Sequence, residues 1–208
     1  MYISDEHKAV LISNVSTASR SICKFFEENY GFEAKTPKHS YRLDGVSKRF
    51  GYEYSDQVKD YSVIMTSRDP FDRAVSIWAR LKESKSANDG YGIYWETFPE
   101  FAKFMETFQS LPPVSFPGYE SPYDSRWVEE HQMWVILPLP QTTVKQWAIN
   151  DFGKVDHIID FANTESIAAI PFVSGEVVLS HIGSSGTTSA DYDTEENRRL
   201  VALWDAGI

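Results

Sequence analysis

Cysteine is nearly absent from this chain of 208 residues, in which Cys23 is the only one. A single cysteine excludes an intramolecular disulfide and a metal centre made of several thiolates. The first residues contain no basic segment followed by a long apolar run, so neither a secretory signal nor a membrane span is expected. These absences predict a soluble, cytoplasmic protein.

Positive charge is also scarce, because 20 Lys and Arg face 30 Asp and Glu, for a net charge of −10. This balance disfavours nucleic-acid binding and binding to an anionic membrane, both of which need clustered cations. A small anionic ligand remains compatible, since a few placed residues and backbone N–H groups can bind it. The five histidines show no metal-binding spacing, and no GxxxxGK[ST] motif is present, so neither a metal site nor a nucleotide-hydrolysing P-loop is predicted.

The hydrophobic pattern begins with a strand, a polar loop and a helix. Lys8–Asn14 is a short apolar run typical of a buried strand, and Val15–Ser21 contains small and polar residues. A helical stripe follows, and Gly31 stands where a helix C-cap is expected. The stripe consists of Ile22, Phe25, Phe26 and Tyr30.

A second strand, loop and helix follow. Tyr61–Thr66 predicts a buried strand, and the loop after it contains Asp69 as a candidate N-cap and Pro70 at the first helical position. The apolar stripe of this helix is Phe71, Ala74, Val75, Trp78 and Leu81. On this helix Arg73, Ser76 and Arg80 are expected on the face opposite the stripe.

The rest of the chain adds shorter predicted elements. Further strands are expected at Phe32–Lys35 and Val155–Phe161, and helices at Thr97–Gln109, Ser125–Val135 and Thr194–Trp204. Thr97 and Glu100 suggest a capping box for the first of these helices.

Alternating strands and helices predict a single α/β domain over residues 1–208, with a mostly parallel sheet. Ligands of such sheets bind beyond the carboxyl ends of the strands, where both polar loops are expected. Hydroxyls, helix N–H groups and Arg68 could hold an anion there. The alternatives are an ordinary capped helix start and surface ion pairs of the arginines with Asp69 and Asp72.

Two segments together resemble the PAPS-dependent sulfotransferases, which use 3′-phosphoadenosine-5′-phosphosulfate (PAPS). VSTASRSI (Val15–Ile22) is similar to the phosphosulfate loop of the family, and SRDPFDRAVS (Ser67–Ser76) closely matches its second cofactor motif. Weaker similarity to the Golgi-type carbohydrate sulfotransferase branch covers Trp95–Met105, Val155–Ser166 and His181–Leu203.

The resemblance implies a three-layer sandwich with a central, mostly parallel sheet, the P-loop-like sulfotransferase fold. It also implies that Arg68 and Ser76 hold the 3′-phosphate of PAPS, and that a late loop around Gly183–Gly186 closes over the nucleotide. The phosphosulfate would be wrapped by Ser16, Thr17, Ala18, Ser19, Arg20 and Ser21. The product would be 3′,5′-adenosine bisphosphate (PAP), and no metal is needed.

One position departs from the family, which usually has Lys where this chain has Ser16. Lysine neutralises charge on the oxygen that bridges phosphate and sulfate, and serine brings no charge. Arg20 is the candidate replacement, with Lys48 or Arg49 as further possibilities. The resemblance gives His39 as the candidate base, and His131 is the second candidate.

The expected reaction is transfer of a sulfuryl group to a hydroxyl of a small molecule or glycan. Trp95, Trp127 and Trp134 are candidate acceptor contacts, although their spacing also fits a helical core. Two other hypotheses stay open. One is a PAPS- or PAP-binding domain with weak or no turnover, and the other is an unrelated phosphate-binding α/β enzyme. The sequence does not assign the acceptor or the oligomeric state.

Overall fold

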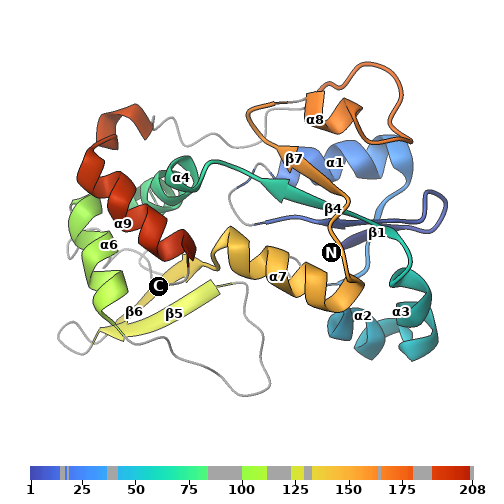
Figure 1. The fold of residues 1–208 in the computed structure, drawn as a ribbon, viewed down its shortest axis with the longest axis horizontal. Coiled ribbons are helices and arrows are strands. Elements are labelled where there is room, and N and C mark those ends of the chain that lie inside the picture. Colours follow the sequence, from blue (N-terminus) through green and yellow to red (C-terminus); the bar gives the residue numbers. More distant parts are fainter. Residues whose placement is uncertain are drawn as a thin grey trace. The chain divides into compact units, whose positions relative to one another are not determined.

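The computed structural model describes residues 1–14, 17, 19–36, 42–83, 100–111, 123–128, 133–163, 165–179 and 189–206. For residues 19, 80–83, 123–128 and 133–138 only the backbone is described. The chain divides into two compact units, each built from two segments (Figure 1). Unit 1 comprises Met1–Arg68 and Gln141–Ile182, and unit 2 comprises Asp69–Pro140 and Gly183–Ile208. The single domain expected over residues 1–208 stays a prediction.

A mixed five-stranded sheet lies at the centre of unit 1, in the order β3-β1-β2-β4-β7. Its strands are β1 (Tyr2–Ser4), β2 (Ala9–Ile12), β3 (Glu33–Ala34), β4 (Ser62–Ser67) and β7 (His157–Asp160). β2, β4 and β7 are parallel, whereas β1 pairs antiparallel with β2 and with β3. The predicted parallel core is therefore confirmed, and β1 adds an antiparallel part that the sequence pattern did not predict.

Helices cover both faces of this sheet, which gives unit 1 the layers of a general α/β sandwich. Figure 1 shows α1 and α8 on one face and α2, α3 and α7 on the other. The helices are α1 (Ser19–Tyr30), α2 (Leu43–Phe50), α3 (Tyr52–Val58), α7 (Gln141–Phe152) and α8 (Glu165–Ala168). Leu11 and Ile64 belong to the same buried cluster as Ile22 and Phe26 of α1, because they are paired in register on neighbouring strands and so face the same side of the sheet.

The predicted ends of two helices are confirmed. Gly31 directly follows α1 with a φ of 60°, a left-handed conformation that glycine adopts without a Cβ penalty. Pro70 opens α4 (Pro70–Glu83), and the Asp69 carboxylate accepts a hydrogen bond from the Asp72 N–H at 3.0 Å. Asp69 is therefore the N-cap of α4.

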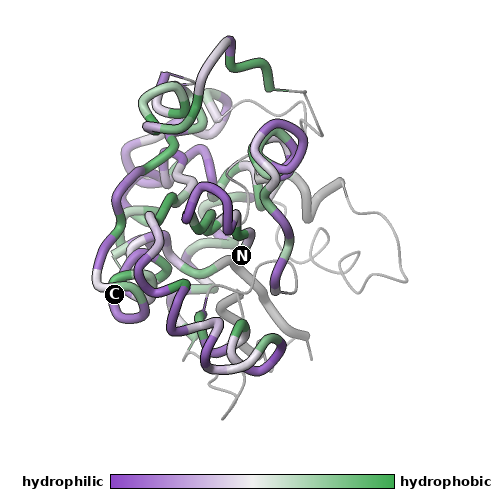
Figure 2. Tube along the Cα trace, turned by 90° about the vertical axis from the view of Figure 1, so that its right-hand side faces the viewer, coloured by the Kyte–Doolittle hydropathy of each residue, from purple (hydrophilic) through white to green (hydrophobic). Residues whose placement is uncertain are grey.

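Unit 2 has a separate core formed by three helices, α4, α6 (Phe101–Ser110) and α9 (Glu195–Ala206). It also contains a 3-10 turn, η3 (Ser189–Tyr192), and the antiparallel strands β5 (Tyr123–Val128) and β6 (Met133–Pro138). Phe71 and Trp78 of α4 pack with Phe101 of α6 and Trp204 of α9. Figure 2 shows that hydrophilic and hydrophobic stretches alternate along the helices, as amphipathic helices require.

The helix expected at Ser125–Val135 is wrong, because this segment forms most of the β5 and β6 pair. Trp127 and Trp134 are directly opposite each other in that pair. A spacing of seven residues brings two side chains onto one helix face, but it also fits two strand positions joined by a short connection. The pattern alone did not separate the two structures.

Two details of the predicted helices are also wrong. α6 begins at Phe101 with Glu100 as its N-cap and no side-chain cap bond, so Glu100 is not the third residue of the helix as the expected capping box requires, and Thr97 lies outside the described residues. Arg73 does not lie on an exposed face, since only 1 % of its surface is accessible. Within the described part of the chain, no helix has the length and apolar character needed to cross a membrane.

Candidate anion-binding site at the carboxyl ends of the parallel strands

The loops that follow β2 and β4 lie at the same edge of the unit 1 sheet. The two strands pair in parallel with Ile12 opposite Met65, so the segments that follow them leave the sheet at the same edge. Beyond them, the Asn14 side-chain amide donates to the Thr66 carbonyl at 2.8 Å, and the Asn14 N–H donates to the Thr66 hydroxyl at 2.8 Å. The residues at the ends of the two predicted strands therefore lie together, and a crevice shared by the two loops stays a prediction.

The N-terminal turn of α1 is suited to an anion. It contains the exposed Arg20 and no acidic residue, so its free N–H groups are not neutralised by a carboxylate of their own helix. Ser21 is buried in the same turn. Of the other predicted loop residues, Ser16 and Ala18 lie outside the described part of the chain, and only the backbone of Ser19 is described.

The Thr17 side chain bonds to the ends of the two strands. Its side chain is fully buried, and its hydroxyl donates to the Asn14 carbonyl at 2.8 Å and contacts the Thr66 hydroxyl at 2.6 Å. A buried hydroxyl that donates within the protein does not extend toward a ligand. The role expected for the Thr17 backbone N–H stays a prediction.

Arg68 is held firmly at the end of β4. Gln141, the first residue of α7, accepts a hydrogen bond from the Arg68 N–H at 2.9 Å and donates one to the Arg68 carbonyl at 2.7 Å. The Arg68 guanidinium lies over the ring of Phe161, 5.3 Å from its centroid. Phe161 directly follows β7, so this cation–π contact joins the carboxyl ends of two neighbouring strands.

The sequence pattern did not predict Gln141 or Phe161 as part of this site. Gln141 lies 73 residues from Arg68 along the chain, and no local motif marks it. Phe161 is the last residue of the strand predicted at Val155–Phe161, and this position at the carboxyl end of a parallel strand is the signal that could have indicated it.

Ser76, the other residue expected at the 3′-phosphate, is half-buried on α4. It belongs to unit 2, whereas Arg68 is the last residue before unit 2 begins. Their shared contact with one phosphate stays a prediction.

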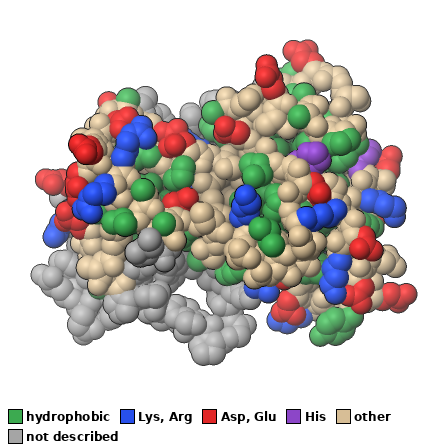
Figure 3. Space-filling view, in the orientation of Figure 1, with side chains coloured by type: hydrophobic (Ala, Val, Ile, Leu, Met, Phe, Trp, Pro, Cys, Tyr) green, Lys and Arg blue, Asp and Glu red, His purple; other side chains and the backbone are tan. Residues whose placement is uncertain are grey.

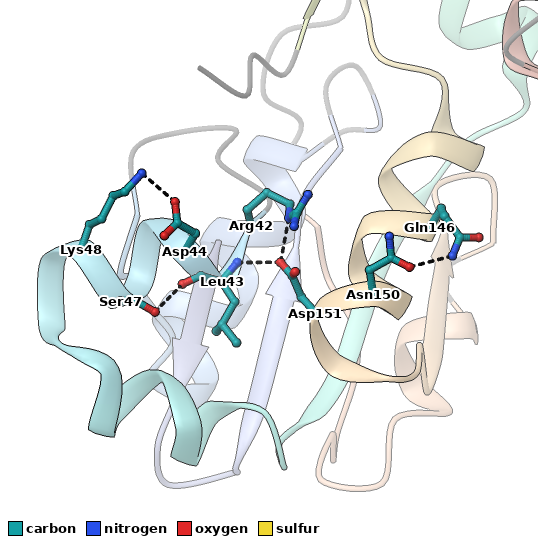
Figure 4. A network of polar contacts seen from close by, with 8 residues as sticks. All are labelled: Arg42, Leu43, Asp44, Ser47, Lys48, Gln146, Asn150 and Asp151. Atoms are coloured by element: carbon teal, nitrogen blue, oxygen red, sulfur yellow. Dashed lines mark hydrogen bonds and ion pairs between the residues drawn. The ribbon is translucent and has the colours of Figure 1, made fainter. Parts of the chain in front are cut away.

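An ionic network holds the segment just after His39. The Asp151 carboxylate of α7 accepts from the Arg42 Nε at 3.0 Å and from the Leu43 N–H at 2.8 Å, which caps α2 from outside (Figure 4). The Arg42 guanidinium also lies over the Trp147 ring, 5.6 Å from its centroid. His39 itself lies outside the described residues, but the chain three residues later is fixed to α7.

Lys48 and Arg49, the two further candidates to replace the charge of the family's lysine, contact residues of their own helix. Lys48 pairs with Asp44 at 2.6 Å one turn earlier on α2 (Figure 4), and the Arg49 guanidinium lies over the Phe50 ring at 5.2 Å. On the face drawn in Figure 3, blue and red side chains are interspersed over the described residues rather than separated by sign. Arg20 and Arg68 are therefore the arginines that the described structure places next to the two loops.

The histidines that are described lie away from this edge. His7 precedes β2 and stacks on Phe172 with ring centroids 4.6 Å apart, and His157 is the first residue of β7. Both stand at the amino ends of parallel strands. His131 and His181 lie outside the described residues.

Other reactive groups in the described residues offer little chemistry. Cys23 is buried, and desolvation raises the pKa of its thiol to about 11, so it stays protonated at neutral pH. Among the described residues, no group of three or more His, Cys, Asp or Glu is arranged to hold a metal ion. Trp95 and the side chains of Trp127 and Trp134 lie outside what is described, so their acceptor role stays a prediction.

No family model, no curated protein and no solved structure matches this chain. Any function proposed for it therefore rests on its own residues.

Proposed function

We propose that this chain is a sulfotransferase that moves a sulfuryl group from PAPS to a hydroxyl acceptor, with carbohydrates as the first acceptor class to test. The observation that carries the proposal is the position of Arg68 at the carboxyl end of β4, beside the loop that precedes α1. Arg68 is the second residue of the segment SRDPFDRAVS, and Gln141 forms hydrogen bonds with the Arg68 backbone. An arginine at the end of one parallel strand and a helix N-terminus after the neighbouring strand suit a ligand that has two separate anionic groups.

The residues present fit such a donor in part. Arg68, with Ser76, would hold the 3′-phosphate, and the N-terminal turn of α1 would meet the 5′-phosphosulfate through its N–H groups. The loop residues assigned to that end are Ser16, Thr17, Ala18, Ser19, Arg20 and Ser21. Ser16 stands where the family has lysine, so Arg20 would supply the positive charge at the oxygen that bridges phosphate and sulfate.

In the proposed reaction the acceptor oxygen forms a bond to sulfur while the bond between sulfur and the phosphate oxygen breaks. PAP leaves with the bridging oxygen, and the acceptor proton passes to a base, for which His39 is the candidate. Arg20 would stabilise the negative charge that develops on the leaving oxygen.

A second function is favoured by one observation, the serine at position 16. Without a cation at the bridging oxygen, the chain would bind PAPS or PAP and transfer slowly or not at all. The two functions share the nucleotide site and differ only in turnover.

A thermal-shift titration with PAP tests the shared site. We expect PAP to raise the melting temperature of the wild-type protein, because a ligand that binds only the folded state stabilises it. Arg68→Ala should abolish the shift, and Lys59→Ala, which removes an exposed cation elsewhere in unit 1, should keep it. No shift in the wild-type protein would refute both functions.

Transfer of labelled sulfate from PAPS to a panel of hydroxyl acceptors then separates enzyme from binder. We expect turnover that falls by at least about 100-fold in His39→Ala, the lower end of what a general base contributes. Arg20→Ala should lower kcat more than PAP affinity. Binding of PAP without transfer to any acceptor would favour the binding domain.

A further inference from the structure

A closed ring of hydrogen bonds joins the end of β4 to the loop before α1. The Asn14 N–H donates to the Thr66 hydroxyl at 2.8 Å, the Thr66 and Thr17 hydroxyls are 2.6 Å apart, and the Thr17 hydroxyl donates to the Asn14 carbonyl at 2.8 Å. All three residues are fully buried. The ring therefore forms away from water, where each bond is stronger and a missing one is costly.

The number of available protons determines which group donates each hydrogen bond of this ring. Each threonine hydroxyl has one proton to donate. Thr17 uses its proton on the Asn14 carbonyl, so the short contact between the hydroxyls requires Thr66 to donate to Thr17. Thr66 in turn accepts from the Asn14 N–H, and every member of the ring both gives and receives one bond.

Thr66 occupies the central place in this arrangement. Its carbonyl also accepts the Asn14 side-chain amide at 2.8 Å, so both its backbone and its side chain contact the loop. Two residues later, Arg68 is fixed by Gln141 and lies over Phe161. Thr66 thus connects the two parts of the candidate site through the last residues of β4.

We propose that Thr66 is a positioning residue that sets the loop before α1 relative to Arg68, so that the two anionic ends of one nucleotide are bound together. This inference rests on the proposed function. Thr66 and the Thr17 hydroxyl do not touch the ligand. They fix the backbone whose N–H groups do, which saves the free energy of ordering that loop at binding.

The test compares PAP with adenosine 3′-monophosphate, which lacks the 5′-phosphate, by isothermal titration calorimetry. Thr66→Val keeps the shape of the side chain and removes the hydroxyl. We expect PAP affinity to fall about tenfold, the effect of about one hydrogen bond. Affinity for the 3′-monophosphate should change less than twofold, and Thr66→Ser should restore PAP affinity.

Matched variants separate positioning from a general loss of stability. Thr17→Val breaks the same ring from the other side and should reproduce the effect, including where Thr66→Val does not fold. Ser55→Ala removes another hydroxyl pair of unit 1, in which the Ser47 hydroxyl donates to the Ser55 hydroxyl at 2.8 Å, and should leave both affinities unchanged.

The outcomes distinguish the two proposals. A wild-type protein that binds neither nucleotide refutes the proposed function. A wild-type protein that binds PAP, with Thr66→Val or Thr17→Val binding it equally well, refutes the positioning role alone. An equal loss of affinity for PAP and for adenosine 3′-monophosphate also refutes the positioning role, because the effect would then not be specific to the loop that binds the 5′-phosphate.

Discussion

Among the described residues, Arg73 is one of the largest fully buried side chains, with 1 % of its surface exposed in unit 2. Its Nη2 donates to the Leu139 carbonyl at 2.8 Å, and its guanidinium lies over the Trp204 ring, 5.4 Å from the centroid. A planar guanidinium can make both contacts at once, which a compact ammonium cannot. Arg73 therefore has a structural role in the sequence segment that also contains the candidate ligand residues.

We expect Arg73→Lys to lower the free energy of unfolding by about 1–3 kcal/mol, because a buried carbonyl loses its donor and the ring contact is lost. Arg199→Lys is the matched control. Arg199 pairs with Glu196 at 2.7 Å, but its side chain is 60 % exposed, so the change should stay below about 0.5 kcal/mol. Urea denaturation of the variants measures both values, and equal losses would contradict the structural role of Arg73.

The sequence pattern predicted Arg73 on an exposed face, because the apolar stripe of a single helix does not show which other elements pack against that helix. Burial of this residue depends on Trp204, which belongs to α9 at the other end of the chain. Arg68 was predictable, by contrast, since its place after a buried strand follows from a local apolar run. Local patterns locate residues along an element, but they do not show which distant element covers them.

At the scale of elements, the start of α4 depends on one side chain. The Asp69 carboxylate satisfies the Asp72 N–H, which has no partner within the helix, and its charge lies at the positive end of the helix dipole. Asp69 thus belongs to the motif SRDPFDRAVS for a structural reason that needs no ligand.

Asp69→Ala should lower the free energy of unfolding by about 1 kcal/mol, the usual effect of losing an N-cap. Asp69→Asn should cost less, because asparagine also accepts the bond. Asp60→Ala, which removes an exposed carboxylate outside the helices, serves as the control and should stay within about 0.5 kcal/mol. Thermal unfolding followed by circular dichroism measures the series, and an Asp69→Ala variant as stable as the control would show that the cap contributes nothing.

The elements that the sequence predicted are those in which apolar residues recur with a clear period or form a continuous run. α1, α4, α9 and the parallel strands follow continuous apolar stripes or runs. α7 was not predicted, because its buried residues include Gln141 and Ala148 and its apolar face is weak. The β5 and β6 pair was mistaken for a helix because tryptophans seven residues apart satisfy both structures.

At the scale of the whole molecule, each unit has its own core. Among the described residues, the buried cluster around Leu11, Phe26 and Ile64 draws its members from unit 1, and the cluster around Trp78 and Trp204 draws its members from unit 2. Sequence patterns did not indicate this division, because unit 2 interrupts unit 1 without a linker of distinct composition.

Unit 1 should therefore fold without the segment 69–140. Gln141 bonds directly to Arg68, so the two ends of the gap lie close together, and a Gly-Ser linker of about four residues is long enough to join them. We expect residues 1–68 and 141–182, joined in this way, to unfold cooperatively in urea. A non-cooperative transition would show that unit 1 depends on unit 2.

The contact between Gln141 and Arg68 has a consequence for how this chain can diversify. The polypeptide leaves the sheet and returns to it at neighbouring points, which is the geometry at which insertions and exchanges of whole segments are tolerated. Changes of length within residues 69–140 need not alter the strands that precede and follow them. Segments of other lengths and sequences can therefore replace this stretch while the sheet of unit 1 stays the same, and Gln141 marks the point where the chain returns.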